Sequence, residues 1–153
     1  MKIGLISDTH GLLRPEAVSA LSGVTQILHA GDVGGPEVIA GLRAIAPVEA
    51  VRGNNDRDAW AVRCLPLRVS LQIAGVHILV LHDLDDLGPK PQTHGHHRVV
   101  VTGHSHKPLV EERSGILFVN PGSAGPRRFK LPITIGYLTI AAGFATAQIR
   151  NLA

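Results

Sequence analysis

Side chains of metal-binding type follow the apolar segments of this 153-residue chain. They are carboxylate, amide or imidazole groups, and each comes at or soon after the end of an expected strand: Asp8, His10, Asp32, Asn54, His82, His104 and His106. In an open α/β sheet the loops at the carboxyl ends of the strands converge on one crevice, where such folds bind ligands. Seven oxygen or nitrogen ligands in one crevice suit two divalent metal ions. We therefore expect a metal site at the C-terminal ends of the strands.

The spacing of these residues predicts how they would hold the ions. Asp8 and His10 lie two residues apart in a segment that we expect to be extended, which places both side chains on one face, and His104 and His106 repeat this spacing. Asp32 can bridge two ions with its two carboxylate oxygens, while Asn54 offers a neutral amide oxygen. A set without thiolates favours manganese, iron, zinc or nickel over a structural zinc site. Ligand type does not choose among them, and manganese is our first expectation.

Each piece of this pattern has a plainer explanation when taken alone. A polar pair after a strand is more often a solvated turn, and Asp32 could cap the helix that begins near Pro36. Five strand ends that all carry ligand-type residues make this explanation improbable for the whole set. His29 lies at the end of a buried strand, so we expect it to contact a ligand or the core rather than a metal ion.

The apolar pattern predicts the elements that position these residues. Strands are expected at residues 2–7, 24–28, 47–51, 67–73, 76–81, 99–102, 109–112 and 116–120, and helices at 15–21 and 36–45. The first half alternates strands with helices, whereas the second half leaves little room for helices. This predicts an α/β sandwich rather than a Rossmann domain. The polar residues 83–97 are expected to form an exposed loop with room for one helical turn.

Composition limits the remaining classes. Hydrophobic residues make up 44% of the chain and charged residues 18%, which excludes disorder. We expect one domain over residues 1–153, because no repeat or linker divides the chain. The net charge is only +3, with scattered arginines and few aromatic rings. These features make a nucleic-acid polymer an improbable partner.

Two further features concern the compartment. A lone cysteine, Cys64, and the lack of a leader pattern indicate a cytoplasmic protein. Residues 131–149 are the only segment apolar enough to suggest a membrane span. Their alternating pattern and the turn at Ala141-Ala142-Gly143 predict a β-hairpin instead. We therefore expect no membrane partner.

An ordered set of motifs runs nearly end to end. It comprises Asp8-Thr9-His10, Gly31-Asp32, Gly53-Asn54-Asn55-Asp56, His82, Gly103-His104-Ser105-His106 and Asn120-Pro121-Gly122-Ser123. This set resembles the calcineurin-like metallophosphoesterases, and among them the small bacterial and archaeal phosphodiesterases. The resemblance implies a four-layer α/β sandwich of two packed mixed β-sheets flanked by helices. It also implies that Asp8, His10, Asp32 and His106 hold one ion, and that Asp32, Asn54, His82 and His104 hold the other.

Two positions depart from the family pattern. Many members carry a histidine where Asn55 stands, and that histidine protonates the leaving group or stabilises the transition state. An amide can donate a hydrogen bond but cannot act as a general acid, so we expect a different role for Asn55 in catalysis. The segment His82-Asp83-Leu84 also lacks the second histidine that relatives often have, although His82 itself can still coordinate.

The expected function is hydrolysis of phosphodiesters, or of phosphomonoesters with good leaving groups, by a hydroxide that bridges two metal ions. The substrate is expected to be a small phosphorylated molecule, and a homo-oligomer is compatible with the sequence. The alternative is a non-catalytic scaffold that keeps this fold and binds a protein partner, as the retromer subunit of the superfamily does. We expect such scaffolds to lose metal ligands, whereas this chain keeps ligand-type residues at all seven positions.

Overall fold

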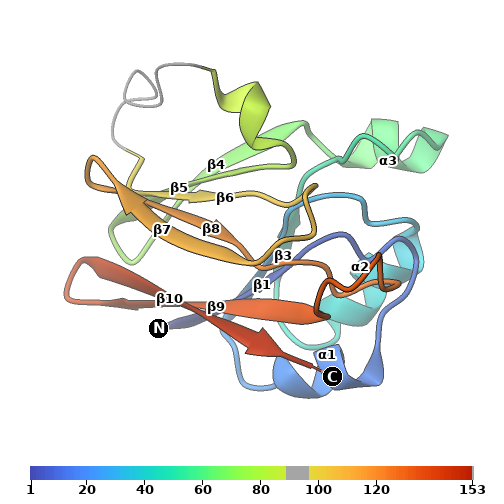
Figure 1. The fold of residues 1–153 in the computed structure, drawn as a ribbon, viewed down its shortest axis with the longest axis horizontal. Coiled ribbons are helices and arrows are strands. Elements are labelled where there is room, and N and C mark those ends of the chain that lie inside the picture. Colours follow the sequence, from blue (N-terminus) through green and yellow to red (C-terminus); the bar gives the residue numbers. More distant parts are fainter. Residues whose placement is uncertain (89–96, 153) are drawn as a thin grey trace.

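Two five-stranded mixed β-sheets lie face to face in the computed structural model, which describes residues 1–88 and 97–152 (Figure 1). The first sheet has the strand order β10-β9-β1-β2-β3. Its strands are β1 (Lys2–Ile6), β2 (Gln26–His29), β3 (Val48–Ala50), β9 (Thr134–Ala141) and β10 (Phe144–Asn151). Strands β1, β2 and β3 run parallel, and β9 pairs antiparallel with both β1 and β10.

The second sheet has the strand order β4-β5-β6-β8-β7. Its strands are β4 (Arg68–Ile73), β5 (Val76–Leu81), β6 (Val99–Val101), β7 (Leu109–Arg113) and β8 (Ile116–Asn120). Strands β5, β6 and β8 run parallel, whereas β4 and β7 are antiparallel to their neighbours. The expected fold class, two packed mixed sheets, is thus confirmed.

The first half of the chain contains three helices: α1 (Pro15–Ala20), α2 (Pro36–Arg43) and α3 (Ala59–Cys64). Helices α1 and α2 begin with proline, whose fixed φ suits the first helical position, and they pack on the outer face of the first sheet. The sequence pattern did not predict α3. Its six residues make fewer than two helical turns, which is too short for a helical period to show in the sequence, and Ala61 is the only one that is buried.

On the outer face of the second sheet the described residues contain one short 3₁₀ helix, η1 (Leu84–Leu87). It corresponds to the helical turn expected within residues 83–97, and its Leu87 packs on the apolar side chains of that face. The histidines at 94 and 96 of the same segment lie outside the described residues.

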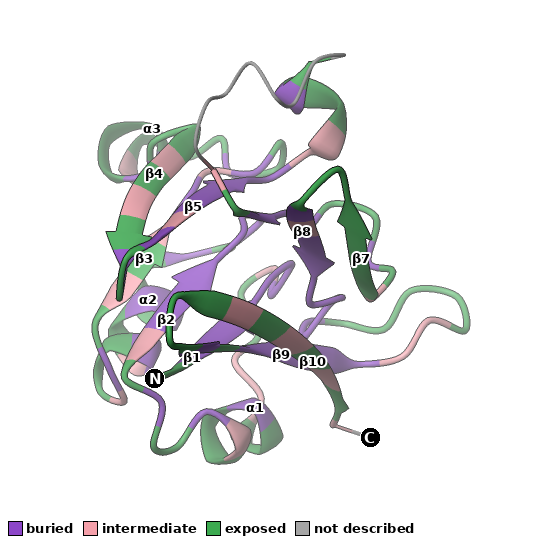
Figure 2. Ribbon diagram, turned by 90° about the vertical axis from the view of Figure 1, so that its left-hand side faces the viewer, coloured by how far each residue is buried: buried purple, intermediate pink, exposed green. Residues whose placement is uncertain are grey.

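The main core lies between the two sheets. Ile3 and Leu5 of β1 point toward the second sheet and contact a cluster that includes Val80 and Val101, whereas Ile6 points toward the helices. Strands buried on both faces read as continuous apolar runs, which is why β1 and β5 show little alternation in the sequence. Figure 2 shows the central strands buried and the edge strands β7 and β10 largely exposed.

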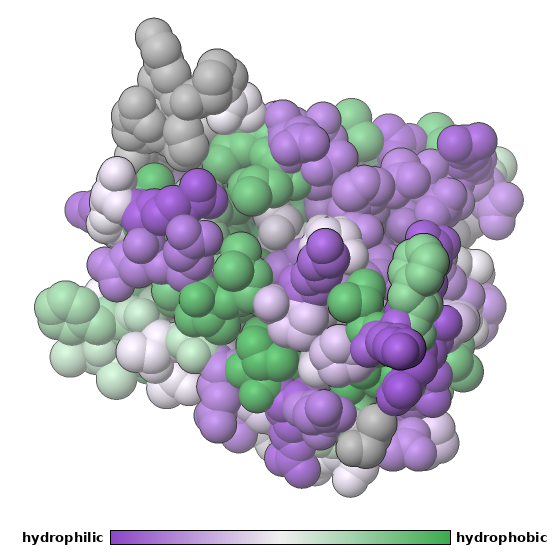
Figure 3. All heavy atoms as spheres, viewed as in Figure 1, coloured by the Kyte–Doolittle hydropathy of each residue, from purple (hydrophilic) through white to green (hydrophobic). Residues whose placement is uncertain are grey.

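The apolar segment 131–149 contains the predicted hairpin. Ala142 and Gly143 form its turn, both with positive φ (52° and 80°), as two-residue turns between twisted strands require. The hairpin tip carries the exposed Phe144 and appears as a pale green protrusion at the left of Figure 3. Among the described helices none has the length and apolarity that a membrane crossing demands.

Candidate metal centre

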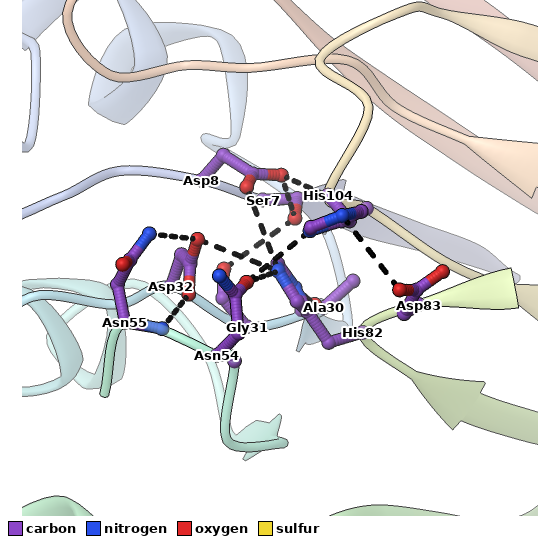
Figure 4. A network of polar contacts seen from close by, with 12 residues as sticks. Ser7, Asp8, Ala30, Gly31, Asp32, Asn54, Asn55, His82, Asp83 and His104 are labelled. Atoms are coloured by element: carbon purple, nitrogen blue, oxygen red, sulfur yellow. Dashed lines mark hydrogen bonds and ion pairs between the residues drawn. The ribbon is translucent and has the colours of Figure 1, made fainter. Parts of the chain in front are cut away.

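The loops that follow β1, β2 and β3 of one sheet and β5 and β6 of the other meet at one end of the sandwich (Figure 4). Backbone hydrogen bonds join them: Asp8 N–H donates to Gly31 O at 3.0 Å, and Gly103 N–H donates to His82 O at 2.9 Å. This is the end opposite to the β9–β10 turn, because Lys2 at the start of β1 pairs with Thr139 near that turn. All seven residues expected to bind metal lie on these loops.

One group of ligand atoms consists of Asp8, His10 and His106. Asp8 Oδ1 lies 3.3 Å from His106 Nε2 and 3.9 Å from His10 Nε2. Asp8 and His106 are buried, while His10 is partly exposed. Three buried or nearly buried ligand atoms thus surround one small space.

A second group consists of Asp8, Asp32 and His82. Asp32 Oδ2 lies 3.4 Å from His82 Nε2 and 3.6 Å from His10 Nε2, so this carboxylate stands between the two groups. Asn54 joins the second group, because its Oδ1 lies 2.9 Å from His82 Nε2. The arrangement has the form that a carboxylate shared by two ions would need.

His104 lies at the margin of the second group. Its Nδ1 is 3.2 Å from Asn54 Oδ1, but its side chain is 44% exposed and its Nε2 faces Asp83 Oδ2 at 3.6 Å (Figure 4). The structure therefore brings all seven residues into one cluster, with six in close contact and His104 at the solvent side.

Several buried polar atoms in this cluster have no hydrogen-bond partner within the part of the chain that the structure describes. They are Asp8 Oδ1, His10 Nε2 and His106 Nδ1. Such atoms are rare in folded proteins, because each forfeits hydrogen bonds to water without replacement. Asp8 Oδ1 and His10 Nε2 lie 3.9 Å apart, and a divalent cation between them would satisfy both.

The hydrogen bonds of His82 fix its tautomer. Its Nδ1 lies 2.7 Å from Ala30 O, and a carbonyl can only accept, so Nδ1 carries the proton and donates it. The lone pair of Nε2 then points at the carboxylate and amide of the second group. A backbone carbonyl that holds the far nitrogen of a ligand histidine is a common feature of metal sites.

Burial and neighbouring charge oppose each other in the ionisation of these groups. Burial alone would raise the pKa of Asp32, but His82 and the Asn55 hydrogen bonds outweigh it and hold the pKa well below its usual value. Burial likewise disfavours the charged form of His82, yet Asp32 raises its pKa overall. The pKa of Asp8 is also lowered, because His106 and the Ser7 hydroxyl overcome its burial. Both carboxylates are thus ionised and ready to bind cations.

The backbone at the site differs from the sequence-based expectation. Asp8 and His10 do not lie in an extended segment: β1 ends at Ile6, and the two residues have φ of 56° and 47°. The described residues include nine non-glycine positions with positive φ, and five of them are expected ligands: Asp8, His10, Asp32, His104 and His106. The left-handed conformation turns the chain sharply at these five positions. Such strain is concentrated at functional sites.

Asp56 ties two ligand loops together. Its buried carboxylate accepts the backbone N–H groups of Val33 at 3.1 Å, Gly34 at 3.1 Å and Gly53 at 2.9 Å. These N–H groups belong to the loops that carry Asp32 and Asn54. Asp56 therefore fixes the two ligands relative to each other without contacting either.

His29 supports the site from below. Gly31 N–H donates to His29 Nδ1 at 3.1 Å, so the proton of the neutral ring is on Nε2, which donates to Thr9 Oγ1 at 3.0 Å. Burial lowers the pKa of His29 to about 4. The ring therefore stays neutral and links the loop of Asp8 to the loop of Asp32, which agrees with the supporting role expected for it.

Gly31 and Gly103 are required by close approach. A Cβ on Gly31 would lie 2.6 Å from His82 Nδ1, and φ at Gly31 is +101°, which glycine adopts without strain. A Cβ on Gly103 would overlap the Ser7 hydroxyl. The glycines that precede Asp32 and His104 thus let the two sheets meet at the site.

Sequence reasoning missed several residues that orient the ligands. Ser7 Oγ donates to Asp8 Oδ2 at 2.6 Å, and Ser123 Oγ donates to Asp8 O at 3.1 Å. Asn120 Nδ2 donates to Gly103 O at 2.9 Å and so holds the loop of His104. The motif Asn120-Pro121-Gly122-Ser123 was a sequence signal for Asn120 and Ser123. For Ser7 the sequence gave no signal beyond its place at the end of a strand.

Asn55 lies beside the shared carboxylate. Its backbone N–H donates to Asp32 Oδ1 at 2.9 Å and its side-chain amide donates to Asp32 Oδ2 at 3.0 Å (Figure 4). The amide therefore lies within the cluster, in direct contact with Asp32.

Comparison with known proteins agrees with this fold and site. The profile of the calcineurin-like phosphoesterase superfamily domain matches residues 1–143, and the chain belongs to this superfamily. A phosphodiesterase of Methanocaldococcus jannaschii is 32% identical over 160 aligned positions, which cover 90% of this chain and 92% of the relative. The family assignment made from the ordered motifs is thus confirmed.

Solved structures extend the likeness to the whole fold. An archaeal phosphodiesterase superposes with a TM-score of 0.82 at 25% identity, covering 98% of this chain and all of the other. Wild-type Vps29 from Entamoeba histolytica, in complex with Zn²⁺, superposes with a TM-score of 0.75 at 23% identity, covering all of both chains. The second likeness concerns the fold alone.

Proposed function

We propose that this protein hydrolyses phosphodiesters, and phosphomonoesters with good leaving groups, with the help of two divalent metal ions. One ion would be held by Asp8, His10, Asp32 and His106, and the other by Asp32, Asn54, His82 and His104. Manganese is the first choice, and iron, zinc and nickel suit the same donors. The substrate would be a small phosphorylated molecule.

The observation that carries this proposal is the cluster itself. Ligand atoms from five loops lie within a few ångströms of one another, and three of the buried ones lack any hydrogen-bond partner in the described residues. The position of Asp32 Oδ2, 3.6 Å from His10 and 3.4 Å from His82, supports a shared carboxylate. Membership of a phosphoesterase superfamily supports the reaction class.

When bound, the two ions would supply a nucleophile from water at neutral pH and positive charge for the phosphoryl oxygens. Imidazole coordinates metal through a nitrogen that carries no proton. For His82 the Ala30 carbonyl holds the ring proton on Nδ1 and so leaves Nε2 to face the metal site.

The contacts of Asn55 support the preference for diesters and activated esters. Its amide donates to Asp32 and has no proton to transfer to a leaving group. An alkoxide of high pKa would therefore leave without a general acid from this position. Esters whose leaving groups depart without a proton are the better substrates.

The test combines metal binding with hydrolysis. Metal-free protein is titrated with Mn²⁺ and the bound ions are counted by calorimetry and metal analysis, while bis(4-nitrophenyl) phosphate and 4-nitrophenyl phosphate are assayed with each of the four metals. Two ions per chain and faster hydrolysis of the diester are expected. Asp58→Ala is the matched control for Asp32→Ala in these assays, because Asp58 is exposed and its side chain makes no cap hydrogen bond. One ion per chain would contradict the dinuclear assignment.

A non-catalytic scaffold is the second candidate, and the fold likeness to Vps29 favours it. Retained ligand residues do not by themselves separate the two functions, since the Vps29 structure is a Zn²⁺ complex. Hydrolysis does separate them. Protein that binds two ions and hydrolyses neither ester with any of the four metals would support the scaffold.

A further inference from the structure

A pocket of about 480 Å³ opens directly beside the second group of ligands. Asn54 and His82 are among its lining residues, so a substrate held at the candidate metal centre would extend into it. Arg52 and Arg68 also line it. Its size lies within the range of pockets that bind small molecules.

Arg52 is the cation of this pocket that remains available. It directly precedes Gly53-Asn54, and its backbone N–H donates to Pro66 O at 2.8 Å, which fixes its position. The residue is half-buried. Across residues 1–88 and 97–152, no hydrogen bond or ion pair engages its guanidinium group. A half-buried, unpaired guanidinium beside a phosphoester site suits an anion.

Two other charged groups of the pocket, Arg68 and Asp83, are engaged elsewhere. Arg68 donates from Nη2 to the backbone carbonyl of Asp86 at 2.9 Å, which holds it against η1. Asp83 Oδ1 accepts the N–H of Asp85 at 3.0 Å, and its Oδ2 faces His104. The carboxylate of Asp86 also lines the pocket but forms no ion pair with Arg52 in the described chain.

We propose that Arg52 binds a second phosphate group of the substrate, next to the phosphoester that is cleaved. The guanidinium presents paired N–H donors that match two oxygens of a phosphate. The ammonium group of a lysine has no such paired donors. The substrate is then a diester whose retained alcohol, such as a sugar, carries a further phosphate. This inference rests on the proposed function, because it places the cleaved phosphoester at Asn54 and His82.

The test uses two chromogenic diesters that differ by one phosphate. They are thymidine 5′-(4-nitrophenyl phosphate) with a free 3′-hydroxyl and the same compound with a 3′-phosphate. The measured quantity is the ratio of kcat/KM for the phosphorylated over the unphosphorylated diester. We expect wild type to favour the phosphorylated diester, and Arg52→Gln to reduce this ratio by about 10- to 100-fold, the range for hydrogen bonds to a charged group. Arg63→Gln, an exposed arginine on α3, is the control and should keep the ratio.

A second variant and a binding measurement make the result decisive. Arg52→Lys keeps the charge but not the paired donors, and it should give an intermediate ratio. Calorimetry on metal-free protein compares thymidine 3′,5′-bisphosphate with thymidine 5′-monophosphate, and wild type should bind the bisphosphate more tightly than Arg52→Gln does. A wild-type ratio near one, or a ratio that survives in Arg52→Gln, would overturn the inference. If neither diester is hydrolysed, the proposed function fails, and the calorimetric comparison alone decides whether Arg52 binds the second phosphate.

Discussion

Replacing His29 by Gln should change how stability depends on pH. The imidazole is fully buried and linked to Gly31 and Thr9, and burial lowers its pKa from 6.5 to about 4 in the folded protein. Between these values the unfolded chain binds a proton at His29 and the folded chain does not. Acidification therefore favours unfolding. Glutamine carries an acceptor and a donor for the same two partners and does not titrate.

The size of the effect follows from the two pKa values. The difference between 6.5 and about 4 corresponds to roughly 3 kcal/mol of stability lost as the pH falls through this window, at about 1.4 kcal/mol per pH unit. The contributions of Asp8 and Asp32, whose pKa values are lowered from 3.8, are lost only below that pH. The raised pKa of His82 changes the stability only above pH 6.5, where the folded chain holds a proton that the unfolded chain releases. The pH dependence of stability between 6.5 and about 4 therefore reports the titration of His29.

The assay is urea unfolding followed by circular dichroism in the presence of EDTA, at steps of half a pH unit from 7 to 4.5. Wild type and Thr9→Ser, which keeps the hydroxyl partner, should lose stability on acidification. His29→Gln should lose about 2.5 kcal/mol less between pH 7 and 4.5, which covers most of the window. Equal slopes in wild type and His29→Gln would refute the argument, since another group would then bind the proton.

Three further changes test the site. Asp32→Ala should lower diesterase activity more than a hundredfold and reduce the number of bound ions. The reason is that both proposed ions would share this carboxylate, and even supporting residues are commonly worth 10–100-fold. The measurements are kcat/KM and metal analysis, and retained activity would contradict the prediction. Asn55→His should accelerate the hydrolysis of esters with poor leaving groups by up to about 10²-fold and that of nitrophenyl esters little. A plot of log kcat/KM against leaving-group pKa would then be flatter for the variant than for wild type. Equal slopes would place Asn55 away from the leaving group. Asp56→Ala leaves three backbone N–H groups without an acceptor and should lower the free energy of unfolding by about 3 kcal/mol. Urea unfolding measures this loss. A loss below about 1 kcal/mol would show that water replaces the carboxylate as acceptor.

Much of the fold could be predicted from the sequence, because burial leaves a periodic mark. The continuous run of β5 was located to the residue, and so was β8. Helix α3 could not be found, since a six-residue helix with one buried residue leaves no such mark. Strand β6 pairs with β8 and not with β7, the strand that follows it in the chain. No local sequence pattern encodes this choice of partner.

The candidate site was predictable in its members but not in its geometry. Asp8 and His10 were expected on one face of an extended segment, but their positive φ angles show a turn. Local spacing cannot reveal this, because the surrounding loops impose the left-handed backbone. Arg52 was equally hidden: in the sequence it is one scattered arginine, and only the folded loop places it beside Asn54 and His82.

The left-handed backbone at five candidate ligand positions lowers folding stability at residues that the proposed activity requires. For a side chain other than glycine this conformation costs roughly 1–2 kcal/mol at each position. Glycine would adopt it freely, but a glycine offers no ligand atom. Selection for thermal stability alone would therefore favour glycine at positions such as His104, whose side chain is 44% exposed. Under the proposed function, histidine and aspartate stand at these positions at a loss of folding stability, because the metal centre needs their ligand atoms.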